Sequence, residues 1–328
     1  MVATITTLSQ ASNPKPASPG RPAPIVEIGA EHDGRRIDNF LLAWLKPAPK
    51  SLIYKIVRDG QVRVNSRRVK PDYRLAAGDR LRLPPLATPS AATPAIARSA
   101  TTRVAAAIVF ENEHLLIVDK PAGLACHGGT GLRYGVVEIA RSLKPDAARV
   151  DLAHRIDRDT SGCLLLSKDV TTLREVHATL RAGDLDKRYL ALMRGRLPRT
   201  LTSIDCALQI ERSAHGERRS RGRSEGKPAL THVVAHSACG PHTLAEFQLV
   251  TGRMHQIRAH AQHIGHPLAG DLMYGEAEFN RDMRACGLRR LFLHASRLAF
   301  RCRGRVIDVE LPLPPELQAV VQRLRATP

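Results

Sequence analysis

The sequence has no apolar run long enough to cross a membrane. Its longest apolar stretch is VAAAIVF at 104–110, far shorter than the roughly 20 residues that a transmembrane helix needs. The N-terminus, MVATITTLSQASNPKPASPGRPAP, has no basic segment followed by an apolar core, so we expect no secretory signal. We therefore expect a soluble, cytoplasmic protein that has no membrane partner.

Cysteine motifs and nucleotide-binding motifs are also missing. The six cysteines are scattered without a C-x-x-C pair, at positions 126, 163, 206, 239, 286 and 302. This pattern favours reduced thiols over a disulfide framework or a zinc ribbon. Neither a P-loop nor a G-x-G-x-x-G followed by a ribose-binding acid is present. We expect no nucleotide cofactor.

Acidic residues are few compared with basic ones. The 328 residues include 50 Lys and Arg against 31 Asp and Glu, a formal charge of +19. Such an excess favours a polyanionic partner through counterion release and long-range attraction. Charge alone leaves RNA, DNA and an anionic membrane open as partners.

The length fits two domains. Low-complexity composition predicts a disordered tail over 1–30 and an interdomain linker over 85–104, since neither stretch has apolar periodicity. Between them lies a small module at 31–84, and the second domain spans 105–322. We expect a monomer with no obligate protein partner.

The small module is basic, with 13 Lys/Arg against 6 Asp/Glu in residues 31–85. Ile37, Phe40, Leu41, Trp44 and Leu45 predict one apolar helix face. A second helix is expected to begin near Ser51, followed by alternating strands up to residue 84. R-x-D-x-F-L at 36–41, GQVRVN at 60–65 and AGDRLRLP at 77–84 make this module resemble the S4 RNA-binding domain. The resemblance implies phosphate contacts by Arg58, Arg63, Arg67, Arg68 and Lys70, and the alternative is an ordinary solvated basic face.

The second domain contains both strand-like alternation and helical periodicity of apolar residues. Alternation predicts strands at 114–121, 162–168, 187–195, 242–250 and 305–312, and helical periodicity predicts helices at 136–143, 171–182 and 253–265. Clustered strands with few helices indicate an α+β domain rather than regular βαβ alternation.

The nonapeptide HRIDRDTSG at 154–162 carries the strongest chemical signal. Asp157 lies between Arg155 and Arg158, and neighbouring guanidinium groups favour an ionised carboxylate that can attack or stabilise an electron-poor carbon. Asp159 precedes Thr-Ser-Gly and is expected to orient the loop. Both aspartates could instead simply pair with arginines. An aspartic protease is disfavoured, because a serine interrupts D-T-G and no second copy exists.

Longer motifs surround this loop. They are KPAGLACHGG at 120–129, KRYLAL at 187–192, EGKPALTH at 225–232, LVTGRMHQIRAHAQHIGHPLAGDLMYG at 249–275 and LFLHASRLAF at 291–300. Together with HRIDRDTSGCLLLSK they resemble the RluA family of pseudouridine synthases over roughly residues 35–317. The resemblance implies an α+β fold with a mixed, mainly antiparallel sheet, preceded by a small S4 (α-L) domain.

By the same resemblance, Asp157 is the essential catalytic aspartate, Arg258 its ion-pair partner and Tyr189 the conserved tyrosine. We expect Arg258 to make a two-pronged contact with Asp157. Tyr189 is expected to pack on uracil, with a core strand residue as the alternative. Arg155 is placed among the RNA-binding residues.

The implied reaction isomerises uridine to pseudouridine without cofactor or metal, and the implied substrate is large-subunit (23S) ribosomal RNA. The target base must be single-stranded or flipped out of a helix. The sequence leaves open which uridines are modified, and whether Asp157 attacks the sugar or supports a glycal-type elimination.

Other interpretations stay open at this point. The histidines at 255, 260, 263 and 266 raise a zinc site, which the lack of a nearby cysteine disfavours. The stretch ERRSRGRSEGK at 217–227 is either a phosphate-binding segment or a mobile loop. A non-catalytic ribosome-assembly factor and an S4-bearing methyltransferase are the competing functions.

Overall fold

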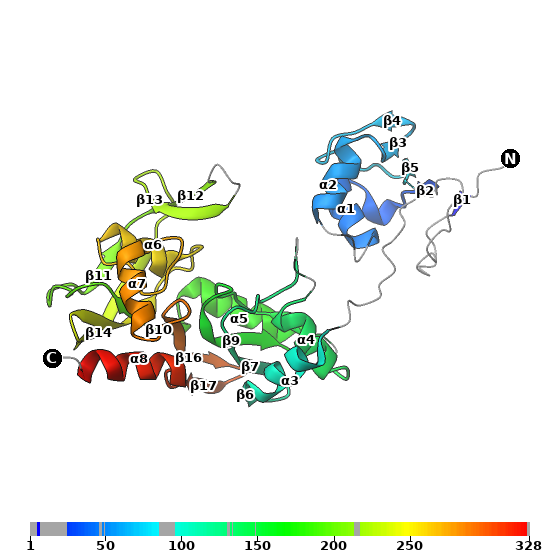
Figure 1. Cartoon of the computed structure of the whole chain (residues 1–328). Coiled ribbons are helices and arrows are strands. Elements are labelled where there is room, and N and C mark those ends of the chain that lie inside the picture. The colour runs from blue at the N-terminus through cyan, green and yellow to red at the C-terminus, as the bar shows by residue number, and fades with distance from the viewer. Residues whose placement is uncertain are drawn as a thin grey trace. The chain divides into compact units, whose positions relative to one another are not determined.

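The computed structural model describes residues 5–6, 25–45, 48, 50–84, 96–129, 132, 134–147, 149–212 and 217–326. The chain forms two compact units, Met1–Ala95 and Ile96–Pro328 (Figure 1), which are described separately below. In the described ranges, no helix has both the length and the apolar character needed to span a bilayer.

The N-terminal unit packs two helices on a small sheet. α1 (Ile37–Trp44) and α2 (Lys50–Arg58) carry the apolar positions predicted from periodicity, and Phe40 and Leu41 are fully buried. The sheet has the order β1-β2-β5-β3-β4. The other elements are β1 Ile5–Thr6, β2 Ile25–Glu27, η1 Ala30–His32, β3 Arg63–Val64, β4 Arg67–Arg68 and β5 Arg80–Arg82.

The structure corrects the predicted boundary of the N-terminal tail. Ile25–Glu27 were placed in a disordered tail, but they form β2 and pair with β5 in antiparallel fashion. Val26 and Ile28 are buried in the core of this unit, and that burial holds the segment in place. Residues 1–4 and 7–24 of the predicted tail lie outside the described residues.

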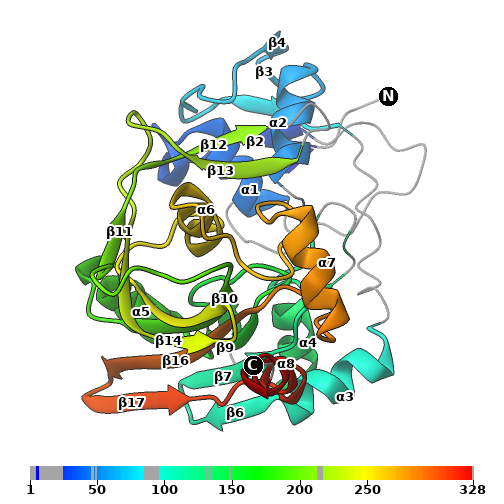
Figure 2. The same ribbon diagram turned by 60° about the vertical axis from the view of Figure 1, so that its left-hand side comes forward.

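The C-terminal unit is built on a ten-stranded sheet in the described residues (Figure 2). Its order is β11-β14-β15-β10-β16-β9-β7-β6, with β17 paired to β16 and β8 to β9. Only the pair β16–β9 is parallel among the pairs of this sheet that the structure describes. The predicted α+β class with a mixed, mainly antiparallel sheet is confirmed.

Most of the predicted elements of this unit are present, with small shifts at their ends. The strands are β6 Ile108–Glu111, β7 Leu115–Lys120, β8 Asp151–Leu152, β9 Ser161–Ser167, β10 Asp186–Met193, β11 Ser203–Asp205, β12 Leu208–Arg212, β13 Arg218–Gly222, β14 Leu230–Cys239, β15 His242–Leu249, β16 Leu293–Cys302 and β17 Arg305–Glu310. The helices are α3 Arg98–Ala106, α4 Val136–Leu143, α5 Val170–Ala182, α6 Gln256–His263, α7 Ala277–Ala285 and α8 Pro315–Ala326.

The end of the predicted linker is also corrected. Residues 98–104 were assigned to a linker, but they form most of α3, and Val104 is fully buried in the core of the C-terminal unit. Alanine and arginine favour helix, and one well-placed valine anchors this helix to the sheet. Residues 85–95 lie outside the described part of the chain.

The junction of β16 with β10 and β9 positions the segments that carry Tyr189 and Asp157. Ala295 on β16 pairs with Tyr189 of β10 on one side and with Gly162 of β9 on the other. Gly162 has φ +109°, and a Cβ there would lie 2.2 Å from the Ala295 carbonyl oxygen. Only glycine therefore permits this close parallel pairing. The loop that carries Asp157 ends directly at this junction.

We predict that Gly162→Ala destabilises the C-terminal unit by about 3 kcal/mol, because backbone strain at positive φ adds to a steric clash with a strand carbonyl. Thermal unfolding followed by far-UV circular dichroism measures the change. The single tryptophan, Trp44, lies in the N-terminal unit, so its fluorescence should show an unchanged transition there.

Gly183→Ala is the matched control. Gly183 also has a positive φ, +84°, but a Cβ there would meet no atom within 4 Å. This variant should cost only about 1 kcal/mol. Equal destabilisation by the two alanines would show that the contact with β16 has no special weight.

Candidate active site

The Asp157 loop connects β8 to β9 and is tied to the segment that follows β7. Cys126 Sγ donates to the Ile156 carbonyl oxygen at 3.1 Å, and the Gly123 amide donates to the Arg158 carbonyl oxygen at 2.9 Å. These contacts hold the backbone on both sides of Asp157. The Asp157 side chain is 24% exposed, so its carboxylate is open to a substrate.

A buried lysine strengthens the same connection. Lys120, at the end of β7, is fully buried, and its ammonium donates to the carbonyl oxygens of Pro121, Leu124 and Arg158 at 2.8–3.0 Å. Burial lowers the pKa of Lys120 to about 8, which leaves it protonated at neutral pH. Three donors on one atom match three carbonyl acceptors, so this cation fixes the loop backbone beside Asp157.

The guanidinium near Asp157 comes from α6. Arg258 Nη1 lies 3.4 Å from Asp157 Oδ2, across 101 residues of sequence. α6 starts at Gln256, whose side-chain oxygen accepts from the Arg253 amide at 3.0 Å and from the Thr251 hydroxyl at 2.7 Å. The predicted helix over 253–265 therefore begins three residues later, and its first turn presents Arg258 to the loop.

The expected two-pronged contact between Arg258 and Asp157 is made instead with Asp271. Arg258 Nε and Nη2 lie 2.7 and 2.9 Å from the two Asp271 oxygens, which leaves Nη1 for Asp157. Asp271 Oδ1 also accepts from the amides of Met273 and Tyr274 at 2.9 Å. One guanidinium thus serves two carboxylates, one buried and one partly exposed.

Direct contact between Arg258 and Asp271 balances their charges. Burial alone would raise the pKa of Asp271, but the hydrogen bonds and charge of Arg258 outweigh burial and lower it. Burial opposes the charge of Arg258, but the contacts with Asp271 and the charge of Asp157 together raise its pKa. Asp271 belongs to the end of the motif at 249–275, and the sequence analysis gave it no role. A lone acid inside a basic motif was the available signal.

Tyr189 faces the Asp157 loop from β10. The side chain is 6% exposed, and within the described residues its hydroxyl makes no hydrogen bond. Burial, and then the nearby charge of Asp157, raise the pKa of Tyr189 above its usual range, so the hydroxyl is protonated at neutral pH. The structure therefore brings Tyr189, Arg258 and Asp157 together.

The arginines next to Asp157 in sequence do not pair with it. Arg158 contacts Asp159, with Nε 3.2 Å from Oδ1 on the exposed side of the loop. Arg155 is exposed and has no ion pair with any residue the structure describes. The charges within HRIDRDTSG led us to expect that the flanking arginines act on Asp157, but the guanidinium that contacts Asp157 is that of Arg258 on α6.

Tyr274 and His255 complete the polar cluster. The Tyr274 ring lies between the guanidinium groups of Arg258 and Arg219, with centroid distances of 4.9 and 5.2 Å. Its hydroxyl lies 2.7 Å from the Ser220 amide and 3.0 Å from His255 Nδ1. His255 Nε2 lies 3.9 Å from Asp157 Oδ1. Neither residue was singled out from the sequence for this place.

Three of the four histidines considered for zinc have separate polar contacts. Buried His260 bonds the Thr231 hydroxyl and the Cys206 carbonyl oxygen, and His266 bonds the Arg194 carbonyl oxygen. His255 faces Tyr274 and Asp157. In the described part of the chain, no three His, Cys, Asp or Glu side chains are placed to hold a metal ion.

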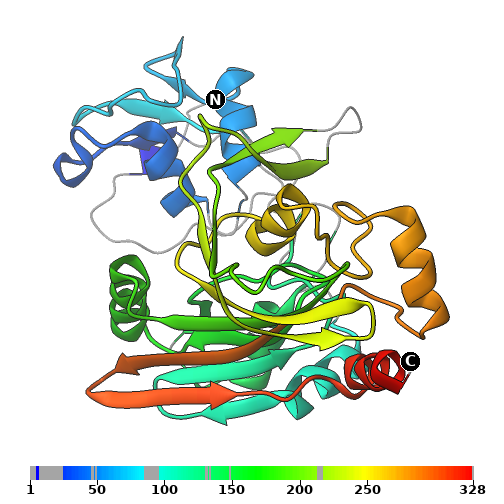
Figure 3. The same cartoon turned by 90° about the vertical axis from the view of Figure 1, so that its left-hand side faces the viewer.

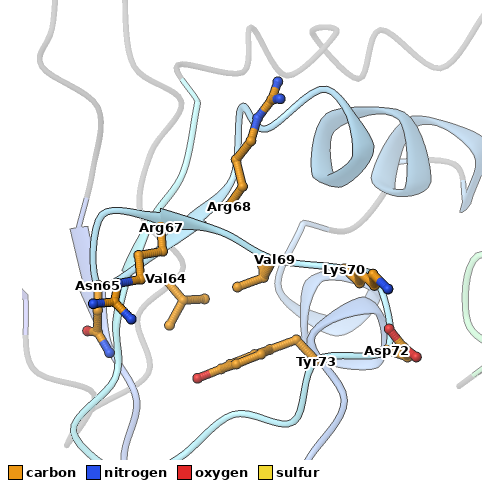
Figure 4. Close-up of a pocket in the computed structure, with 8 residues that line it drawn as sticks. All are labelled: Val64, Asn65, Arg67, Arg68, Val69, Lys70, Asp72 and Tyr73. Atoms are coloured by element: carbon orange, nitrogen blue, oxygen red, sulfur yellow. The ribbon is translucent and has the colours of Figure 1, made fainter.

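The basic residues predicted in the N-terminal unit lie on its surface. Their side chains are all exposed: Arg58, Arg63, Arg67, Arg68 and Lys70. Three of them, Arg67, Arg68 and Lys70, line a pocket together with Tyr73 (Figure 4). This surface belongs to the N-terminal unit, whereas Asp157 belongs to the C-terminal unit.

The arginine-rich stretch 217–227 contains a strand. Arg218–Gly222 form β13, which pairs with β12 in a two-stranded hairpin. Along the vertical axis of Figure 3, α6 lies between this hairpin and the large sheet. Ser220 is buried against Tyr274, whereas Arg218, Arg221 and Arg223 are exposed. The hairpin thus connects a basic surface to the cluster around Arg258.

The chain matches known proteins in both units. The RNA pseudouridylate synthase family matches residues 114–263, and the S4 domain matches residues 35–81. The ribosomal large subunit pseudouridine synthase C of Yersinia pestis is 44% identical over 305 residues, which cover 92% of this chain and 95% of that protein. The protein of the same name from Escherichia coli (strain K12) is 44% identical over 307 residues, 92% of this chain and 96% of that protein. The solved structure of Human RNA Pseudouridylate Synthase Domain Containing 1 is 28% identical, with a TM-score of 0.54, over 68% of this chain and 95% of that chain.

Proposed function

The chain belongs to the RNA pseudouridylate synthase family, and we propose that Asp157, Arg258 and Tyr189 isomerise uridine to pseudouridine in large-subunit ribosomal RNA. The single observation that supports these roles is the contact of Arg258 with Asp157 in a partly exposed site beside Tyr189. The substrate class follows from the names of the bacterial relatives and from the S4 domain.

The reaction breaks the C1′–N1 bond, turns the uracil and bonds C5 to C1′. C5 loses its hydrogen as a proton to water, and N1, which has lost its bond to C1′, takes up one proton, so the step is an isomerisation. A carboxylate held by one guanidinium contact can act on the electron-poor sugar while its other oxygen stays available. Tyr189, protonated and nearly buried, supplies a ring to pack on the base and a hydroxyl that can exchange a proton with it.

Access of the base to this site requires an unpaired nucleotide. A uridine stacked in a helix cannot bring C1′ to Asp157, so the target is in a loop or is flipped out. The exposed guanidinium of Arg155, two residues before Asp157, is suited to contact the RNA next to that nucleotide. On this proposal, the exposed cations of the N-terminal unit contact RNA phosphates: Arg58, Arg63, Arg67, Arg68 and Lys70.

The proposed target positions are those of the ribosomal large subunit pseudouridine synthase C proteins, rather than those of other S4-bearing family members. Identity of 44% over nearly the whole chain supports this choice. On this proposal the protein acts as a monomer in the cytoplasm, where bacterial ribosomal RNA is made.

We predict that deleting the gene removes pseudouridine from specific positions of large-subunit ribosomal RNA. Chemical mapping of pseudouridines in the deletion strain measures this loss, and the wild-type gene should restore every lost position. Small-subunit ribosomal RNA is the internal control. Loss confined to small-subunit RNA or transfer RNA would contradict the proposed target.

We predict that Asp157→Asn abolishes the reaction, with a loss of at least about a thousandfold, because a neutral amide cannot replace the carboxylate. Ribosomal RNA tritiated at uracil C5 measures turnover, since each isomerisation releases one C5 hydrogen. Affinity for RNA should be equal or slightly higher, because the substitution removes a negative charge near a polyanion.

Asp159→Asn is the matched control for this variant. Asp159 lies in the same loop but pairs with the exposed Arg158, so tritium release should stay close to wild type. Equal loss in both variants, or normal release by Asp157→Asn, would contradict the assignment of Asp157.

We predict that Arg258→Lys lowers kcat by at least about a hundredfold. Lysine cannot hold the Asp271 carboxylate with two parallel hydrogen bonds and also reach Asp157 with a third. Tritium release at saturating RNA measures this effect. Arg297→Lys is the control, because Arg297 makes an equivalent two-pronged contact with Asp308 near the surface and should tolerate lysine. A similar fall in both variants would point to general loss of folding.

A further inference from the structure

The Tyr274 hydroxyl has two neighbours, and the direction of one of its two hydrogen bonds is fixed. The Ser220 backbone N–H can only donate, so the Tyr274 oxygen accepts from it at 2.7 Å. The tyrosine proton is then free for the second neighbour, His255 Nδ1, at 3.0 Å. In this arrangement Nδ1 is the acceptor, and the imidazole carries its proton on Nε2.

The Nε2 atom of His255 points toward Asp157. It lies 3.9 Å from Asp157 Oδ1, whereas Arg258 Nη1 lies 3.4 Å from Oδ2. The two donors thus approach different oxygens of one carboxylate. A gap of 3.9 Å is longer than a hydrogen bond, and such contacts often tighten only when substrate binds.

The backbone conformation and the neighbours of His255 hold its imidazole ring in one orientation. His255 precedes α6 with φ +52°, a conformation that is uncommon for residues other than glycine. Its ring meets the Tyr274 ring edge-on at 5.6 Å. Burial lowers the pKa of His255, while Asp157 opposes that effect, so the imidazole is neutral at neutral pH. Arg258 and Asp271 are the other charged groups close to His255. Asp159 has a smaller effect, which raises the pKa of His255.

We propose that His255 is a positioning residue for Asp157, and that Tyr274 holds it in the tautomer that turns an Nε2–H toward the carboxylate. The proposal deepens the proposed function, because it assigns how the reactive carboxylate is oriented. When RNA fills the site and displaces water, His255 donates to Oδ1 while Arg258 holds Oδ2. The reactive carboxylate is then fixed from both sides.

The test compares two substitutions of similar size at one position. Gln places an N–H donor near the position of Nε2, whereas Leu has no donor there. We expect His255→Leu to lower kcat about 30-fold, the scale of a hydrogen bond to a charged acceptor, with little change in KM. His255→Gln should recover at least half of that loss on a logarithmic scale. Single-turnover tritium release from ribosomal RNA measures both variants.

Tyr274→Phe tests whether Tyr274 selects the tautomer of His255. It keeps the ring between Arg258 and Arg219 but removes the hydroxyl that selects the tautomer. We expect kcat to fall about fivefold to tenfold, because the Nε2–H form is no longer selected over the Nδ1–H form. Nitrogen-15 NMR of the imidazole should show mainly Nε2–H in the wild-type protein and a mixture in Tyr274→Phe.

The outcomes separate this inference from the proposed function. Equal losses in His255→Gln and His255→Leu would overturn it, since a purely structural residue would behave that way. A change confined to KM would also overturn it and would indicate an RNA contact. Nδ1–H in the wild-type NMR spectrum would overturn it without any activity measurement. Failure of the proposed function itself would appear separately, as no tritium release by the wild-type protein.

Discussion

A single buried guanidinium organises the candidate active site. Arg258 uses two of its nitrogens to hold Asp271, which is fully buried, and the third to reach Asp157. The ion pair with Asp271 compensates the charge of Arg258 and fixes the direction of its guanidinium. A buried ion needs such a partner to be tolerated. Asp157 then receives a donor whose position does not depend on Asp157 itself. If Asp157 is the reactive group, as proposed, it can change its contacts during the reaction while Arg258 stays held by Asp271.

The segment that begins with Lys120 supplies a second constraint on the Asp157 loop. Lys120 binds two carbonyl oxygens at the turn after β7 and a third, that of Arg158, in the Asp157 loop, and Cys126 binds a fourth at Ile156. Backbone groups without partners are costly to bury, so these side chains stabilise an irregular loop inside the unit. The loop is rigid because its carbonyls are satisfied by side chains from one neighbouring segment. Asp157 is presented on that support toward α6 and β10.

The sequence predicted the regular parts of the fold well and the contacts between distant segments poorly. The helix at 136–143 matches α4 at both ends, because the Gly135 amide and the Glu138 side chain form a local start signal. Asp157, Tyr189 and Arg258 were identified through motifs. The role of Asp271 was missed because its partner, Arg258, was assigned to another carboxylate. Val26 and Val104 looked like parts of unstructured segments, since their burial depends on strands and helices far away in sequence.

The place of β16 in the sheet has a consequence for biosynthesis. β16 (Leu293–Cys302) lies between β10, which carries Tyr189, and β9, which follows Asp157, and it is among the last elements of the chain. A nascent polypeptide leaves the ribosome from its N-terminus, so the RNA-binding unit emerges well before β16 is translated. Until then, Tyr189 and the Asp157 loop have no shared neighbour to align them. A chain interrupted before residue 293 would keep its basic surface but lack an assembled candidate active site.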